Sequence, residues 1–221
     1  MLSKLSGKKS IRVRAARKLS KASKGAIRIV ARAKLPTRFG AFEILGIEGK
    51  AEQESAVALV RGRIRGGAPL VRIHSQCFTG DTLASERCDC RAQLELSLRK
   101  IAGSPSGVLL YLPQEGRGIG LMNKLRAYEL QDRGMDTVEA NEELGFAADS
   151  REYGFSAKAL RLLGVHRVRL LSNNPDKVQQ LEKAGIKVVE RVPCRPRTTL
   201  NSRAYMETKR TKLGHLLDRL K

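Results

Sequence analysis

The fold is decided by VRLLSNNPDKVQQLEKAGIKVV, residues 168–189, where a strand, a helix and another strand follow one another. Val168–Leu171 and Ile186–Val189 are short apolar runs of the kind that form buried strands. Between them, Pro175 is suited to the first turn of a helix and Gly185 to its end. The pattern predicts an α/β fold with parallel strand pairing in this part of the chain.

Outward from this stretch, the spacing of apolar residues predicts further elements. Apolar residues at helical spacing predict helices over residues 92–101, 119–132 and 156–163, with Ser156 as the N-cap of the third. Short apolar runs predict strands over residues 56–62, 70–74 and 108–111. We therefore expect mixed sheets, with antiparallel β in the first half of the chain and strand–helix alternation in the second.

The composition is that of a soluble globular protein. Hydrophobic residues make up 41% of the chain, which is enough to bury a core. No apolar run approaches the roughly 18 residues that a membrane-spanning helix needs, and no apolar leader follows Met1. We expect a cytoplasmic protein that does not bind a membrane.

Positive charge is concentrated at the two ends of the sequence. The formal net charge is +21, and residues 1–34 contain 12 Lys and Arg residues but no acidic one. Because such a composition is typical of a solvated segment, we expect a basic, disordered extension over residues 1–34. The folded domain would then span residues 35–221 and end in a basic segment. Nucleic-acid binding by the basic ends and a transit peptide are alternatives that are not favoured.

Three of the four cysteines, Cys77, Cys88 and Cys90, lie close together in the sequence. A disulfide framework is not expected in a cytoplasmic chain, and charged neighbours argue against simple burial. Three thiolates fill three tetrahedral positions on Zn²⁺ and leave the fourth for a water that can attack an electrophilic carbon. The cluster therefore favours a catalytic zinc site, and Cys194 is expected to be an ordinary cysteine.

The glycine-rich stretch Gln114–Leu121 lies between a predicted strand and a predicted helix. Its glycines would let backbone N–H groups approach an anion, and Arg117 adds a positive charge. The stretch is neither a Rossmann fingerprint nor a Walker loop, so a tight structural turn explains it equally well.

Two other polar segments are ambiguous when read alone. Ser172–Lys177 follows a strand and could bind phosphate or carboxylate, although a helix cap by Asn174 is the simpler interpretation. Asp149 and Arg151 by themselves would indicate only a surface ion pair.

Taken together, these segments resemble GTP cyclohydrolase II. The stretches that carry the resemblance are residues 72–81, 87–95, 114–121, 136–141, 144–149 and 172–175, then Tyr205 and residues 212–217. Their order and number cover roughly residues 33–218, so a chance match is very improbable.

The resemblance implies a hydrolase that opens the imidazole ring of GTP as the first step of riboflavin biosynthesis. Its products are formate, pyrophosphate and 2,5-diamino-6-(5-phosphoribosylamino)pyrimidin-4(3H)-one. It also implies one Zn²⁺ per chain, Mg²⁺ with the triphosphate, and a homodimer. The length leaves no room for the dihydroxybutanone phosphate synthase domain that some relatives carry, so we expect the stand-alone form.

The resemblance also assigns roles to individual residues. Cys77, Cys88 and Cys90 correspond to the zinc ligands. The GTP-binding positions are Arg72, Ile73, His74, Ser75, Gln76, Gln93, Glu115, Gly116, Arg117, Thr137, Ser172 and Lys177. Asp149 corresponds to the proton acceptor, Arg151 to the nucleophile on phosphate, and Tyr128 to a donor to the ring during the second hydrolysis, which releases formate.

Three alternatives stay open. A guanidinium is a poor nucleophile at neutral pH, so Arg151 is equally suited to clamp the phosphates while water cleaves them. A related enzyme could stop at the formamidopyrimidine product. A catalytically inactive zinc protein that binds nucleic acid through its basic termini is the third possibility, and the intact set of candidate catalytic residues argues against it.

Overall fold

The computed structural model describes residues 26–51, 54–196, 199 and 202–217. Most of the predicted basic extension therefore lies outside the described residues. The predicted boundary between Lys34 and Leu35 is wrong, because strand β1 begins at Arg28 and runs through both residues. Basic residues of β1 pair with glutamates on the next strand, as Arg28 does with Glu48 at 3.0 Å, so they belong to the sheet.

One seven-stranded mixed sheet forms the centre of the molecule, in the order β1-β2-β3-β5-β4-β6-β7. Its strands are β1 (Arg28–Thr37), β2 (Gly40–Glu48), β3 (Ser55–Arg61), β4 (Leu70–Ser75), β5 (Gly107–Leu112), β6 (Arg167–Leu171) and β7 (Lys187–Val192). The pairs β1–β2, β2–β3 and β3–β5 are antiparallel, whereas β5–β4, β4–β6 and β6–β7 are parallel. This confirms a mixed α/β fold, with the correction that β4 lies inside the parallel part although it comes early in the chain.

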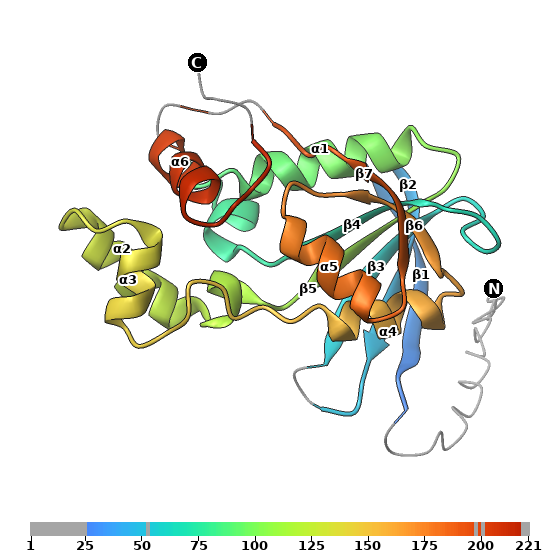
Figure 1. Cartoon of the computed structure of the whole chain (residues 1–221). Helices are drawn as coiled ribbons and strands as arrows, with labels where there is room; N and C mark the ends of the chain where they lie inside the picture. Colours follow the sequence, from blue (N-terminus) through green and yellow to red (C-terminus); the bar gives the residue numbers. More distant parts are fainter. Residues whose placement is uncertain (1–25, 52–53, 197–198, 200–201, 218–221) are drawn as a thin grey trace, which may run out of the picture.

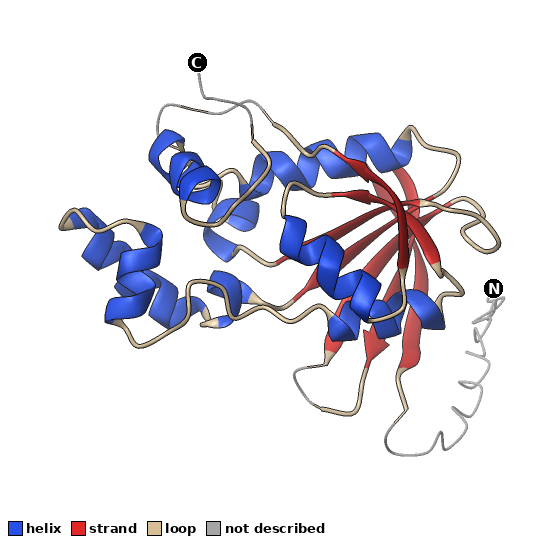
Figure 2. Cartoon of the chain, in the orientation of Figure 1, coloured by secondary structure: helices blue, strands red, loops and turns tan. Residues whose placement is uncertain are grey.

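Helices cover both faces of the sheet (Figures 1 and 2). They are α1 (Cys90–Ala102), α2 (Leu121–Asp132), α3 (Thr137–Glu143), α4 (Gly154–Leu162), α5 (Pro175–Lys183) and α6 (Arg203–Thr211), with short helical turns η1 (Phe78–Thr82) and η2 (Glu115–Gly118). Helix α1 covers one face, and α4 and α5 cover the other. Helices α2 and α3 extend beyond one end of the sheet.

Two apolar clusters hold these layers together, one on each face of the sheet. Because successive strand residues point to opposite faces, Val108 of β5 belongs to one cluster and its neighbour Leu109 to the other. The first cluster includes Leu160 of α4 and Leu181 of α5, and the second includes Ile101 of α1. The strands of the parallel region are therefore fixed from both sides.

Most predicted elements are confirmed, but one helix cap is wrong. Ser156 lies inside α4, fully buried, and its hydroxyl finds no hydrogen-bond partner among the described residues. The helix begins at Gly154, and the neighbouring Ala157, Ala159 and Leu160 are buried in the first apolar cluster. Asn174 does cap α5, since its side chain accepts a hydrogen bond from the Asp176 amide at 2.9 Å.

No helix within the described ranges is long and apolar enough to cross a lipid bilayer.

Candidate active site

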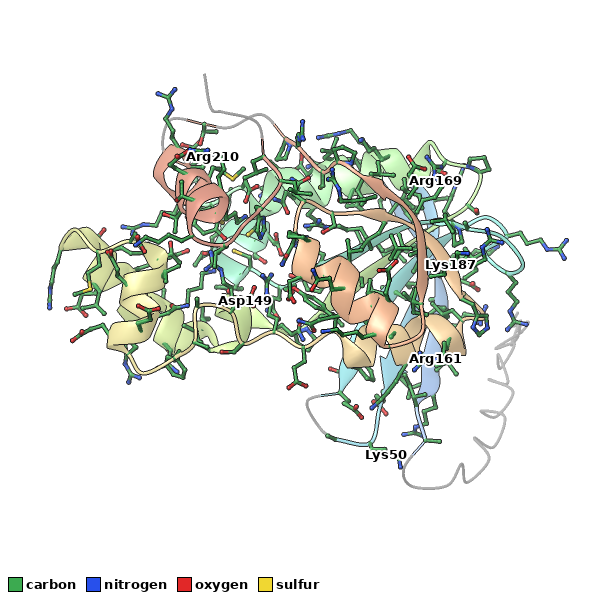
Figure 3. The ribbon with its side chains drawn as sticks, in the orientation of Figure 1. Lys50, Asp149, Arg161, Arg169, Lys187 and Arg210 are labelled. Carbon is green, nitrogen blue, oxygen red and sulfur yellow. The ribbon has the colours of Figure 1, made fainter. Side chains whose placement is uncertain are left out.

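The loops that carry the predicted site residues follow three neighbouring parallel strands. Cys77 comes shortly after β4, the glycine-rich turn after β5, and Ser172 directly after β6. Because the carboxyl ends of parallel strands meet at one edge of a sheet, these loops converge, as in other open α/β folds. Asp149 precedes α4 and lies between the sheet and the α2–α3 pair (Figure 3).

The three predicted zinc ligands come together. The Sγ atoms of Cys77, Cys88 and Cys90 lie within 4.8 Å of one another, and those of Cys77 and Cys88 are 3.6 Å apart. Zn–S bonds of about 2.3 Å in a tetrahedron require sulfur atoms separated by roughly 3.8 Å. The cluster therefore fits a zinc ion with only small adjustments.

Gly80 makes room for this cluster. A Cβ atom at this position would lie 3.0 Å from the Sγ atoms of both Cys77 and Cys88. The close approach of the thiols also gives them different pKa values. Hydrogen bonds from the Cys88 and Cys90 thiols hold the pKa of Cys77 far below its usual value. The hydrogen bond between Cys77 and Cys88 raises the pKa of Cys88 to about 11. A bound cation would replace these thiol protons, so metal binding should release protons.

Lys124 lies against the cluster and was not predicted from the sequence. Its Nζ donates hydrogen bonds to Cys77 Sγ at 3.1 Å and to the Glu115 carboxylate at 2.7 Å. Burial opposes its charge, but the bond to Glu115 and the nearby Cys77 raise the pKa of Lys124 overall. Lys124 lies one helical turn before Tyr128 on α2, so i, i+4 spacing from the predicted Tyr128 would have found it.

Tyr128 faces the sulfur cluster from α2. Its hydroxyl lies 3.0 Å from Thr79 Oγ1, and burial raises the pKa of its phenol. The guanidinium of Arg87 lies over its ring at 4.8 Å from the centroid. Tyr128 is therefore a protonated hydroxyl at neutral pH, held beside the candidate metal site.

Two adjoining cavities occupy this edge of the sheet. The first has about 660 Å³ of empty space, part of it open to solvent, and is lined by the three cysteines together with Glu115, Tyr128 and Thr137, among others. The second has about 560 Å³ of empty space, part of it open to solvent. It is lined by Arg72, His74, Gln93, Ser172, Lys177 and several residues of the C-terminal segment. Ser75, Cys90, Arg117, Arg151 and Tyr205 line both. We refer to the first as the cysteine cavity and to the second as the basic cavity.

The basic cavity is built to hold negative charge. Among the described residues that line it, five are Arg or Lys and none is Asp or Glu. Three of the five donate to uncharged groups: Arg72 to the Leu171 carbonyl at 3.1 Å, Arg117 to the Ala148 carbonyl at 3.3 Å, and Lys177 to the Ile73 carbonyl at 2.9 Å. Buried cations without a facing carboxylate are costly unless an anion joins them.

Arg117 and Lys177 have further features that favour anion binding in the basic cavity. Nη2 of Arg117 is buried and has no hydrogen-bond partner in the described part of the chain. Arg117 also has a φ of 60°, a strained backbone for a residue with a side chain. Burial and the neighbouring charge of Arg72 lower the pKa of Lys177 well below its usual value, which a bound polyanion would reverse.

Asp149 and Arg151 form a two-pronged ion pair beside both cavities. Nε of Arg151 donates to Asp149 Oδ1 at 2.8 Å, and Nη2 donates to Oδ2. Burial opposes the charge of Arg151, but these bonds raise its pKa above the ordinary guanidinium value. The same bonds outweigh burial for Asp149 and lower its pKa.

Several other predicted GTP-binding residues are engaged within the protein. The side chain of Ile73 is fully buried, and only its carbonyl meets the site, through Lys177. Gln93 uses both ends of its amide, and His74 Nε2 is bonded to Asp81 at 3.0 Å. Glu115 accepts from the Phe78 amide at 2.6 Å as well as from Lys124.

The C-terminal segment contributes residues that were not predicted as site residues. Tyr205, Lys209, Leu213 and His215 line the basic cavity from α6 and the turn after it. The guanidinium of Arg117 lies 5.6 Å from the centroid of the Tyr205 ring. Helix α6 was missed because its sequence is mostly polar and lies far from the other motifs.

Comparisons with known proteins identify the family of this chain. The family model of GTP cyclohydrolase II matches residues 28–193. A GTP cyclohydrolase-2 of Hahella chejuensis is 56% identical over 189 residues, which are 85% of this chain and 91% of that protein. A GTP cyclohydrolase-2 of Escherichia coli O9:H4 is 55% identical over 191 residues, 86% of this chain and 97% of that protein.

A longer relative matches as well. A riboflavin biosynthesis protein of Vibrio vulnificus is 53% identical over 194 residues, which are 87% of this chain but 53% of that protein. The chain therefore spans about half the length of this relative and more than nine-tenths of the other two. The matches confirm the resemblance seen in the sequence: the chain belongs to the GTP cyclohydrolase II family.

Proposed function

We propose that this protein hydrolyses GTP, opens its imidazole ring and releases formate and pyrophosphate, as the first step of riboflavin biosynthesis. The observation that carries the proposal is the junction, at one sheet edge, of a cavity lined by three cysteines and a cavity lined by five Arg and Lys residues. The cysteine cavity suits a metal-assisted attack on a ring carbon, and the basic cavity suits a triphosphate. Family membership supports the same reaction.

Cys77, Cys88 and Cys90 would hold the zinc ion. Bound there, zinc would supply a Lewis acid that makes water acidic enough to attack near neutral pH. The target is C8 of guanine, an amidine-like carbon between two ring nitrogens. Lys124 would keep the Cys77 sulfur anionic. Tyr128, whose hydroxyl is protonated, would donate a proton to the nitrogen that leaves C8 in the second hydrolysis, when formate is released.

The triphosphate would lie in the basic cavity with Mg²⁺. Lys177, Arg117 and Ser172, which line this cavity, would contact it, and Arg72 would add charge from β4. Charge-assisted hydrogen bonds to phosphate are about twice as strong as neutral ones. Gln93 and Glu115, which are already bonded within the protein, would act by holding the cavity walls, while backbone groups near Gly116 contact the nucleotide.

For Arg151 we propose the role of phosphate clamp rather than nucleophile. Nucleophilic attack requires a neutral guanidine, and the ion pair with Asp149 makes the guanidinium harder to deprotonate. Asp149 would orient Arg151 and accept a proton from the attacking water. A phosphoramidate trapped on Arg151 during turnover would contradict this assignment.

Product analysis tests the proposal. Zinc-loaded protein, GTP and Mg²⁺ should yield formate, pyrophosphate and the diaminopyrimidinone by mass spectrometry, and a Cys88→Ser variant should yield none. A product that keeps the formyl carbon would establish the shorter reaction instead. Salt-dependent nucleic-acid binding without any GTP turnover would favour the inactive zinc protein.

The family resemblance also supports a homodimer. Light scattering coupled to size-exclusion chromatography would test it, and a mass of about one chain would contradict it.

A further inference from the structure

A buried ion pair joins helix α6 to the segment that carries two of the cysteines. Lys209 Nζ donates to Asp89 Oδ1 at 2.6 Å, and the two side chains are only 8% and 2% exposed. Asp89 lies between Cys88 and Cys90 and directly precedes α1. The pair therefore links residues 120 positions apart in the chain at the point where the sulfur cluster is formed.

The second oxygen of Asp89 continues the connection. Gln93 Nε2 donates to Asp89 Oδ2 at 2.5 Å, and Arg72 Nη2 donates to Gln93 Oε1 at 2.5 Å. The carboxylate is thus held from opposite sides, by Lys209 of α6 and by Gln93 of α1. A peptide segment whose middle side chain is fixed at both oxygens has little freedom to rotate the thiols on either side of it.

Other contacts keep Lys209 in place. The Lys209 carbonyl accepts a hydrogen bond from the His215 amide at 3.0 Å, and its Nζ lies 4.3 Å from the centroid of the Tyr205 ring. The Leu216 amide donates to the Asn173 carbonyl at 2.9 Å, which anchors the turn after α6 beside β6. This segment follows residue 193, where the match to the family model ends.

We propose that Lys209 is a positioning residue of the metal site, which fixes Cys88 and Cys90 through Asp89. Helix α6 is then part of the structure that binds the metal. The inference rests on the proposed zinc site but not on the identity of the nucleotide. Removing Lys209 would leave the buried Asp89 carboxylate without its cation, and such a charge draws in water or moves toward the surface.

The test compares Lys209→Met with Lys212→Met. Lys212 lies in the same segment and pairs with Glu139 of α3 at 2.9 Å, away from the cysteines. Zn²⁺ affinity is measured by competition with a chromogenic chelator without nucleotide, and Co²⁺-loaded protein reports the geometry through its visible absorption. Loss of an outer partner of a metal site commonly weakens binding roughly 10–100-fold. We expect a loss of that size and a shifted Co²⁺ spectrum in Lys209→Met, recovery in Lys209→Arg, and no change in Lys212→Met.

One set of results would overturn the role proposed for Lys209. Unchanged Zn²⁺ affinity and Co²⁺ spectrum in folded Lys209→Met, with a raised KM for GTP, would show that Lys209 serves only the anion and would overturn the proposal. If Lys209→Met does not fold, the double variant Asp89→Asn/Lys209→Met carries the test, because it leaves no unpaired buried charge. Weakened Zn²⁺ binding in that variant supports the proposal, and wild-type affinity contradicts it. Since the Zn²⁺ affinity and the Co²⁺ spectrum are measured without GTP, they are independent of a failure of the proposed reaction.

Discussion

The cysteine cavity and the basic cavity share a wall but are built in opposite ways. The cysteine cavity collects three sulfur atoms from residues 77–90, a single stretch of chain between β4 and α1. The basic cavity collects five cations from residues 72 to 209, which the fold must bring together. The difference shows that a metal site can be encoded locally, whereas a polyanion site at a sheet edge depends on the whole topology.

The different linings of the two cavities also divide the chemistry between them. The cysteine cavity should govern bond making at the base, and the basic cavity should govern affinity for the triphosphate. Variants in the cysteine cavity should therefore lower turnover with little effect on the affinity for GTP. Variants in the basic cavity should lower the affinity for GTP with little effect on turnover.

The largest expected effect is that of Cys88→Ser. A hydroxyl is a far weaker zinc ligand than a thiolate, so the variant should lose zinc and its turnover should fall by roughly 10³-fold or more. Its GTP affinity should stay within a few-fold of wild type, because the basic cavity is intact. Elemental analysis, turnover and calorimetry check this, and equal losses of affinity and turnover would contradict the separation.

Tyr128→Phe should have the next largest effect. Removing a positioned proton donor commonly slows a step by about 10²-fold or more. The expected result is a lower kcat, an unchanged Kd for GTP, and accumulation of the formamidopyrimidine. Zinc content serves as the control. A wild-type rate of formate release would remove Tyr128 from the mechanism.

Lys177→Met tests the basic cavity. A lost charge-assisted hydrogen bond costs about 1.5–3 kcal/mol, which corresponds to a Kd for GTP that is roughly 10–100-fold higher. Zinc content should not change. Lys183→Met on the exposed side of the same helix is the matched control and should bind GTP normally. A lower kcat with unchanged Kd would place Lys177 in the chemical step instead.

The cysteine cavity could be predicted from the sequence more readily than the basic cavity. Cys77, Cys88 and Cys90 favoured a metal site before the fold was known, because the three thiols and their charged neighbours lie in one short segment. Ser172–Lys177 stayed ambiguous until β4 and β6 were seen to be neighbours, since parallel pairing brings together residues about 100 positions apart.

Some features could not have been derived from sequence patterns. The charges of Arg28 and Arg32 looked like part of a solvated extension, because nothing in their own segment shows the glutamates of β2 that pair with them. Lys209 has no local signal, since its partner Asp89 is reached only through the docking of α6. Asp149 and Arg151 owed their prediction to the family resemblance.

A smaller effect concerns pH. Burial, and then the positive charges of Lys209 and other neighbours, lower the pKa of His215 from 6.5 to about 3. The unfolded chain therefore binds a proton below pH 6.5 that the folded protein refuses. Stability from this residue is complete above pH 6.5 and is lost as the pH falls toward 3, by about 1.4 kcal/mol at pH 5.5.

Urea unfolding at pH 7.5 and 5.5 checks this prediction. His215→Asn, which cannot titrate, should lose less stability between the two pH values than the wild type. An identical pH dependence in both proteins would show that folding does not lower the pKa of His215.

The most direct measurement follows the reacting carbon itself. With GTP labelled with ¹³C at C8, NMR of the zinc-loaded protein should show the C8 signal disappear and ¹³C-formate appear in equal amount, together with pyrophosphate. Cys88→Ser should leave the label in GTP. A folded, zinc-loaded wild-type protein that leaves the C8 signal unchanged would contradict the proposed hydrolysis.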